Sequence, residues 1–320
     1  MTAVVAAVLA VLATATATAA HQGNPEPPQQ TNPPAGTRFE SSLGAQIAVP
    51  ASWAVNDSGC GMTARPSVVR GKGLEPLCYS PEPPTKELAI IEESLDPAQE
   101  TDQKTMIDEV TAWRGGTRLR DGRYAAWVRI PSRRVAVDVR TRDPWVTAGI
   151  LHSVHLVDID HLGCPTRQPP RETGAAPRTT SSPRRSTFVP AAPTSVSVCY
   201  YGGGDRLQAS AAFGTDTNGA APNASARRLA EALNAAPAGL NPDRPARDCD
   251  ARADLPGDDA ILLLRDGATT DGTVRLRFSS CTGGGMVNDA GQQARLTRTL
   301  VATIMAPVHA GYSVSADLPV

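Results

Sequence analysis

The sequence predicts an α+β fold made of two small domains, each an antiparallel sheet backed by helices and joined by a linker rich in proline and arginine. Three observations carry this prediction. Short segments of alternating apolar residues recur on both sides of Pro165–Pro193, separated by turn residues. Each side also contains segments with apolar residues at helical spacing. A chain of 320 residues is long enough for two domains of ordinary size.

Composition divides the chain into five segments. Residues 1–20 are predicted to be a signal peptide or an N-terminal anchor, and residues 21–36 a disordered spacer rich in Pro, Gln and Asn. Residues 37–163 form the first α+β domain. Residues 164–193 form the linker, in which Pro, Ser, Thr and Arg predominate, and residues 194–320 form the second α+β domain.

The first 20 residues carry no charged side chain. The apolar stretch Ala3–Ala13 has the length of a signal-peptide core and is short for a membrane span. Ala17, Thr18 and Ala19 supply small residues at the spacing of a cleavage site. We therefore expect a secreted or extracytoplasmic protein, which stays anchored to the membrane through residues 1–20 if the segment is not removed.

The first domain is predicted to begin with strands and to alternate between strands and helices. The strands are expected over residues 38–43, 45–49, 67–70 and 87–93. Met106, Ile107, Val110 and Trp113 have helical spacing and predict a short helix over Thr105–Trp113.

The rest of this domain is predicted to contain an antiparallel strand pair, a helix and a last strand. The pair is formed by residues 124–130 and 135–140, because Val135, Val137 and Val139 alternate with less apolar residues. Asp143 as N-cap and Pro144 in the first turn predict a helix that ends near His152. A strand over residues 154–159 would follow.

The second domain is predicted to have the order β-β-α-β-β-α. A hairpin is expected from the alternating residues 196–201 and 207–213, and two further strands over 260–265 and 273–278, joined through Asp266-Gly267 and Asp271-Gly272. One helix is expected over 224–236 with Asn223 as its cap, and another over 292–305.

Six cysteines form no CxxC and have no zinc-site spacing. In an exported protein such a set predicts disulfides. We expect the pairs Cys60–Cys78, Cys249–Cys281 and Cys164–Cys199, one of 15 ways to pair six cysteines. The last pair would close the linker at its base.

The formal net charge of −1 argues against nucleic acid as a partner. The linker nevertheless carries several arginines against the single acid Glu172. These arginines could contact an anionic envelope polymer or a membrane surface, or they could belong to a solvated spacer. They are Arg167, Arg171, Arg178, Arg184 and Arg185.

One cluster of residues has the side chains that a metal site needs. It consists of His152, His155, Asp158, Asp160 and His161. The alternative is that these are ordinary polar residues at the end of a domain. The sequence contains no nucleophile elbow, no His-Glu-x-x-His and no Ser-x-x-Lys motif. We therefore expect no cofactor, and the catalytic residues of any enzyme activity stay unknown.

A resemblance supports the expected location. The run Val49–Trp53, then Asn56-Asp57, Cys60-Gly61, Cys78 and the run Asp160–Cys164 resemble uncharacterised secreted proteins of actinomycetes. The outline of the first domain is also similar to that of PsbP-like and mycobacterial lipoprotein modules. The resemblance implies an extracytoplasmic location and carries over no catalytic residues.

The sequence as a whole favours an exported, disulfide-stabilised binding or scaffold protein of the cell envelope or extracellular space, with an unidentified ligand. The alternative is a secreted hydrolase or metal-dependent enzyme that uses the His152–His161 region. Convergence of these side chains in one cleft would favour the enzyme.

Overall fold

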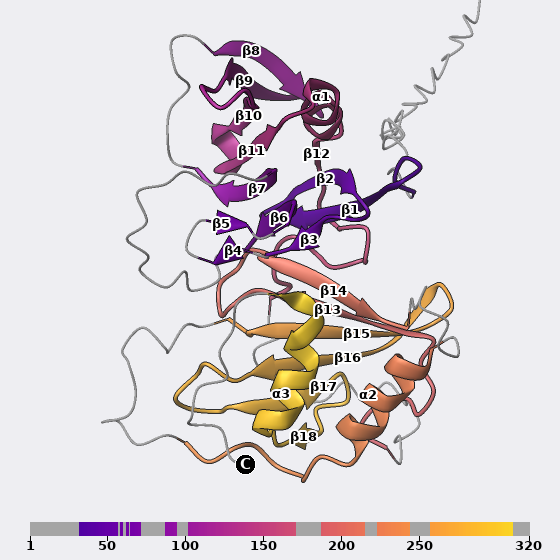
Figure 1. Ribbon diagram of the computed structural model, residues 1–320. Coiled ribbons are helices and arrows are strands. Elements are labelled where there is room, and N and C mark those ends of the chain that lie inside the picture. The colour runs from indigo at the N-terminus through magenta and orange to yellow at the C-terminus, as the bar shows by residue number, and fades with distance from the viewer. Residues whose placement is uncertain are drawn as a thin grey trace, which may run out of the picture. The chain divides into compact units, whose positions relative to one another are not determined.

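The computed structural model describes residues 32–56, 58–59, 62–63, 65–71, 87–94, 102–170, 187–214, 223–243 and 257–309. Residues Pro33–Val320 form one compact unit. The fold is α+β, with a few short helices and several antiparallel or mixed sheets (Figure 1). The division into two domains joined by a linker is not confirmed and stays a prediction.

A three-stranded antiparallel sheet lies at the start of the unit. It consists of β1 (Thr37–Ser42), β2 (Ala45–Pro50) and β12 (His155–Leu156). Leu43 and Gly44 connect β1 to β2 with φ angles of 54° and 83°, as a tight two-residue hairpin turn requires. The first two strands confirm the prediction, whereas the strand expected over residues 154–159 is limited to two residues.

A seven-stranded mixed sheet follows. In pairing order its strands are β3 (Ala54–Val55), β6 (Ser67–Arg70), β7 (Leu88–Glu93), β11 (Val135–Thr141), β10 (Tyr124–Ile130), β9 (Val110–Arg118) and β8 (Gln103–Ile107). β6 pairs in parallel with β3 and with β7, so this sheet is not wholly antiparallel as predicted. A separate small pair is formed by β4 (Ser58–Gly59) and β5 (Met62–Thr63).

Helix α1 (Pro144–His152) packs on one face of this sheet and confirms the predicted helix. The Asp143 side chain accepts a hydrogen bond from the backbone N–H of Trp145, as an N-cap does. Ile150 and Leu151 of α1 are buried against Val128, Val137 and other apolar residues of the sheet. The opposite face of β9, β10 and β11 points away from α1.

The helix predicted over Thr105–Trp113 is wrong. Residues 103–118 form the hairpin of β8 and β9, in which Ile107 pairs directly with Val110. Asp108 and Glu109 form the turn with φ angles of 44° and 64°, as in a type I′ turn. Met106 is 56% exposed although helical spacing had placed it on the buried face.

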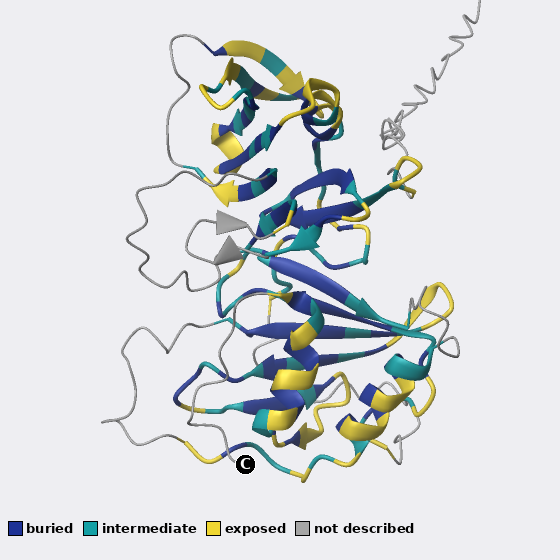
Figure 2. Cartoon of the chain, in the orientation of Figure 1, coloured by how far each residue is buried: buried dark blue, intermediate teal, exposed yellow. Residues whose placement is uncertain are grey.

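The C-terminal half is built on a six-stranded antiparallel sheet. In pairing order its strands are β14 (Ala209–Phe213), β13 (Ser195–Tyr200), β15 (Ala260–Asp266), β16 (Thr269–Arg277), β17 (Gly285–Asn288) and β18 (Gln293–Ala294). Helices α2 (Ala224–Asn234) and α3 (Arg298–Met305) pack on one face, where a single apolar core joins them to the central strands. Figure 2 shows the buried inner strands and the exposed outward sides of both helices.

Three predictions for this half need correction. The second helix begins at Arg298, not Gln292, because Thr297 is its N-cap and the preceding residues form β17 and β18. Asn223 holds the predicted N-cap position of α2, but its side chain makes no capping hydrogen bond, since its amide faces the carbonyl oxygens of Thr194 and Gly214. Asp271-Gly272 lies inside β16 beside a register shift, so only Asp266-Gly267 belongs to the turn.

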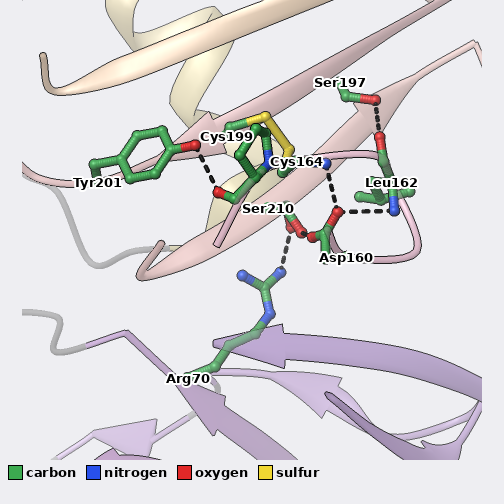
Figure 3. Close-up of a disulfide and its surroundings, with 9 residues drawn as sticks. Arg70, Asp160, Leu162, Cys164, Ser197, Cys199, Tyr201 and Ser210 are labelled. Carbon is green, nitrogen blue, oxygen red and sulfur yellow. Dashed lines mark hydrogen bonds between the residues drawn. A yellow bond between two sulfur atoms is a disulfide. The ribbon is translucent and has the colours of Figure 1, made fainter. Parts of the chain in front are cut away.

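Residues 158–170 run from the first half to the free face of the six-stranded sheet and are held there by several contacts (Figure 3). Cys164 and Cys199 form the predicted disulfide, with Cα atoms 5.4 Å apart and no exposed surface. The Tyr201 hydroxyl donates to the Pro165 carbonyl at 2.7 Å, and the Ser197 hydroxyl donates to the Leu162 carbonyl at 2.8 Å. The disulfide therefore fixes this segment to β13.

Candidate functional site

The candidate site is a pocket of about 520 Å³ on the face of the seven-stranded sheet that points away from α1. Side chains alternate along a strand, so Trp127 and Arg129 of β10 point away from the core that holds Val128 and Ile130. Trp127 lies directly opposite Asp138 of β11 in the strand register. The pocket therefore gathers side chains from neighbouring strands onto one surface. We call it the arginine pocket. Its lining residues are Thr117, Leu119, Arg120, Asp121, Arg123, Ala125, Ala126, Trp127, Arg129, Asp138, Val139 and Arg140.

Small residues make room for the indole of Trp127. Gly115 is its direct cross-strand neighbour, and a methyl group at Gly115 would overlap Trp127 and Asp102. The indole N–H donates to Asp102 Oδ1 at 3.0 Å. Because the Asp102 carboxyl is completely buried, this hydrogen bond fixes the orientation of the ring.

Arg129 stands beside the same indole. Its guanidinium carbon lies 5.5 Å from the centre of the Trp127 ring, within range of a cation–π interaction. Its Nη1 lies 3.9 Å from Asp102 Oδ2, which is an ion pair too long for a hydrogen bond. Nε and Nη1 are both buried, and neither has a hydrogen-bond acceptor among the described residues. A buried polar group without a partner needs an explanation, such as a bound water, an ion or a ligand.

Asp138 supplies a carboxyl group to the same surface. Burial raises its pKa, although the charges of Arg129 and Arg140 and a hydrogen bond with Glu92 act in the opposite direction. A carboxyl group whose pKa is raised in a pocket is a common feature of functional sites. Asp138 can therefore accept hydrogen bonds when charged and donate one when protonated.

The turn between β9 and β10 forms one end of the pocket. Arg123 is almost fully buried and forms an ion pair with Asp121 at 2.5 Å. Hydrogen bonds from Arg123 lower the pKa of Asp121 and keep that carboxyl charged. Arg120 is exposed on the same turn. The pocket thus combines guanidinium groups at both ends with an aromatic side wall.

The predicted metal ligands do not come together. His152 is exposed in the last turn of α1, and Asp158 is exposed beyond β12. His155 Nδ1 lies 3.3 Å from Asp108 Oδ1 of the β8–β9 turn. In the described part of the chain, no three His, Cys, Asp or Glu side chains are placed to hold a metal ion.

The remaining two residues of that cluster belong to structural contacts. Asp160 Oδ1 accepts hydrogen bonds from the N–H groups of Leu162 and Cys164, and its Oδ2 accepts one from the Ser210 hydroxyl at 2.5 Å (Figure 3). His161 Nδ1 lies 3.3 Å from the Ser41 hydroxyl, and partial desolvation of its ring lowers its pKa. Asp160 therefore orders the segment that carries Cys164.

Only some of the predicted disulfide cysteines and linker arginines belong to the described residues. Cys281 is disulfide-bonded, but Cys249, Cys60 and Cys78 lie outside the described residues, so those two pairings stay predictions. Of the linker arginines, Arg167 is described and forms an exposed ion pair with Asp205 at 3.0 Å. The remaining four lie outside the described residues.

The sequence prediction missed the arginine pocket, although the strands that it correctly expects over residues 124–130 and 135–140 carry most of the lining. It predicts a helix where β9 begins, so the strand that pairs with the other edge of β10 is missing. A strand interpretation would have placed Trp113, Gly115 and Thr117 on one face of β9. Trp127 and Arg129 alternate with Val128 and Ile130 in the same way on β10. That alternation was the available signal, and it becomes visible only once both strands are assigned.

Comparison with known proteins identifies no relative. No protein-family model, no curated protein and no solved structure matches the chain. None of the helices in the described ranges combines the length and the apolar character needed to cross a membrane.

Proposed function

We propose that this protein is an exported, disulfide-stabilised binding protein that acts at the cell envelope or outside the cell and holds its ligand in the arginine pocket. The observation that carries the proposal is the concave surface of β9–β11, where Trp127 stands among four guanidinium groups and the carboxyl of Asp138. Its volume of about 520 Å³ lies within the usual range of small-ligand pockets, roughly 300–1,000 Å³.

The proposed location rests on two features. The uncharged, apolar residues 1–20 have the composition of a signal peptide. The buried Cys164–Cys199 disulfide fits a compartment in which disulfides form and persist. N-terminal sequencing of the protein recovered from outside the cytoplasm tests this point. A mature start near Ala20 or His21 is expected, and retention of Met1 in a cytosolic fraction would contradict export.

The binding activity is tested by co-sedimentation of the full chain with insoluble envelope material. Arg120→Gln/Arg140→Gln removes two charges of the pocket, and Arg227→Gln/Arg228→Gln removes two exposed charges of α2 as the matched control. We expect the pocket variant to bind about tenfold more weakly, so that far below saturation its bound fraction falls by about 90%, while the control binds like the wild type. Equal binding by both variants, or no binding by the wild type, would refute the proposal.

A further inference from the structure

The arginine pocket contains three kinds of binding group, and each restricts the ligand. The guanidinium groups are planar donors that match carboxylate and phosphate oxygens. The Trp127 indole rests on Gly115 and presents an apolar wall to the cavity. Asp138 offers a carboxylate that can accept hydrogen bonds from the ligand when it is charged. A ligand that satisfies all three must carry an acid group, an apolar face and hydrogen-bond donors.

The charge balance argues against a highly charged ligand. Four arginines and two aspartates line the pocket, which leaves a formal charge of +2. Asp102 beside Trp127 and Glu92 beside Asp138 reduce the sum for the wider surface to zero. A polyphosphate would therefore meet carboxylates as well as guanidinium groups, and its acceptor-only oxygens cannot satisfy a charged Asp138.

One negative charge on a hydroxylated ring fits these groups better. A carboxylate in the cavity can pair with the Arg129 guanidinium, which lines the pocket and whose Nε and Nη1 have no acceptor among the described residues. Arg140 lies on the neighbouring strand in the row next to Trp127, because its register partner is Ala125. The small Ala125 side chain lines the pocket beside Arg140 and Trp127.

We propose that the pocket binds an acidic sugar, such as a hexuronic acid unit of an acidic polysaccharide. The apolar face of the sugar ring packs on Trp127, the carboxylate pairs with Arg129 and Arg140, and ring hydroxyls donate to Asp138. This inference rests on the proposed binding function and names the class of its ligand.

Calorimetric titration of the full chain with matched probes tests the inference. The acidic probe is an oligogalacturonate, and the neutral probe is the same oligomer after reduction of its carboxyl groups. We expect the neutral oligomer to bind at least about tenfold more weakly, because it lacks the group that pairs with the guanidiniums. Polyglutamate and inorganic polyphosphate serve as anions without a sugar ring. Equal or tighter binding of either one would overturn the inference.

Variants of the pocket residues test whether the oligogalacturonate binds in the arginine pocket. Trp127→Leu removes the ring and Arg140→Gln removes one charge, while Arg228→Gln on α2 is the control. We expect each pocket variant to weaken oligogalacturonate binding about tenfold and the control to leave it unchanged. An unchanged far-ultraviolet circular dichroism spectrum and thermal midpoint show that a variant is folded. A folded Trp127→Leu that binds normally would overturn the inference.

The result also separates this inference from the proposed function. If the envelope material binds through the pocket but oligogalacturonate does not bind, the acidic-sugar inference fails and the binding function stands. If neither binds, both fail.

Discussion

Glu40 and Arg70 form a buried ion pair whose loss should strongly destabilise the fold. Arg70 Nε donates to Glu40 Oε2 at 2.5 Å, and the two side chains are only 4% and 7% exposed. Arg38 Nε binds the other carboxylate oxygen at 2.7 Å. Burial alone would raise the pKa of Glu40, but the charges and hydrogen bonds of Arg70 and Arg38 outweigh it and lower the pKa.

Glu40→Gln keeps the shape of the side chain and removes its charge. Arg70 would then be a buried cation that loses its charged partner, while its Nη2 keeps the hydrogen bond to the Ser210 carbonyl at 2.9 Å. Breaking a buried pair by removing one partner costs about 3–5 kcal/mol. Since glutamine still offers one acceptor, we expect a loss of about 3 kcal/mol in the free energy of unfolding, measured by urea denaturation at pH 7.

A double variant separates the lost ion pair from a general packing defect. Glu40→Gln/Arg70→Met has no buried charge left without a partner, so it should be more stable than Glu40→Gln alone. Arg167→Gln is the control, because both partners of the Arg167–Asp205 ion pair are exposed and the pair should contribute only about 0–1 kcal/mol. A loss below about 1 kcal/mol for Glu40→Gln, or additive losses in the double variant, would refute this reasoning.

The pH dependence gives an independent check on Glu40. Its pKa is lowered by folding, so the stabilisation is complete above its ordinary pKa of 4.5 and is lost as the pH falls through the folded-state pKa. The difference in unfolding free energy between wild type and Glu40→Gln should therefore shrink below pH 4.5. A difference that stays constant down to pH 3 would show that the carboxylate charge is not the cause.

Three further predictions concern the disulfide and the pocket. Cys164→Ala/Cys199→Ala opens a loop that the disulfide closes over 35 residues. In the chain-entropy model the unfolding free energy should then fall by about 4 kcal/mol. A loss below about 1 kcal/mol in denaturant titration would argue against a structural role of the disulfide. Gly115→Ala should cost about 1–3 kcal/mol and shift Trp127 fluorescence, because its methyl group overlaps the indole; an unchanged spectrum would contradict that packing. Asp138→Asn should gain stability relative to wild type as the pH rises above 3.8, because folding raises the pKa of this carboxyl; a flat difference between pH 3 and 7 would contradict it.

The elements that could be predicted are those with a local signal. Asp143 and Pro144 mark the start of α1, and both hold the positions expected of them. The alternation of Val135, Val137 and Val139 correctly identified β11 as a strand with one buried face. In these places the turn or cap residues and the apolar pattern indicate the same element, so a short window of sequence is enough to predict it.

The failures occur where one apolar pattern fits two structures. Met106, Ile107, Val110 and Trp113 satisfy helical spacing, yet the Asp108–Glu109 turn folds the segment into a hairpin. Two non-glycine residues at positive φ are an unusual way to make such a turn, since Asn-Gly or Asp-Gly is preferred. The local signal for a hairpin turn is therefore weak, and the pairing of β9 with β10 decides that this segment is a strand and not a helix.

The geometry of the arginine pocket depends on the β8–β9 hairpin. The Asp108–Glu109 turn sets the register in which Gln103 pairs with Arg114, and this register brings Asp102 next to Gly115. From there the Asp102 carboxylate reaches the Trp127 indole, which the β9–β10 register places over Gly115. A one-residue slip in β8 would send its side chains to the opposite face and remove the partner that orients the ring. The alternation along β10 therefore indicates which side chains share a face, but the orientation of Trp127 depends on a turn outside the cavity.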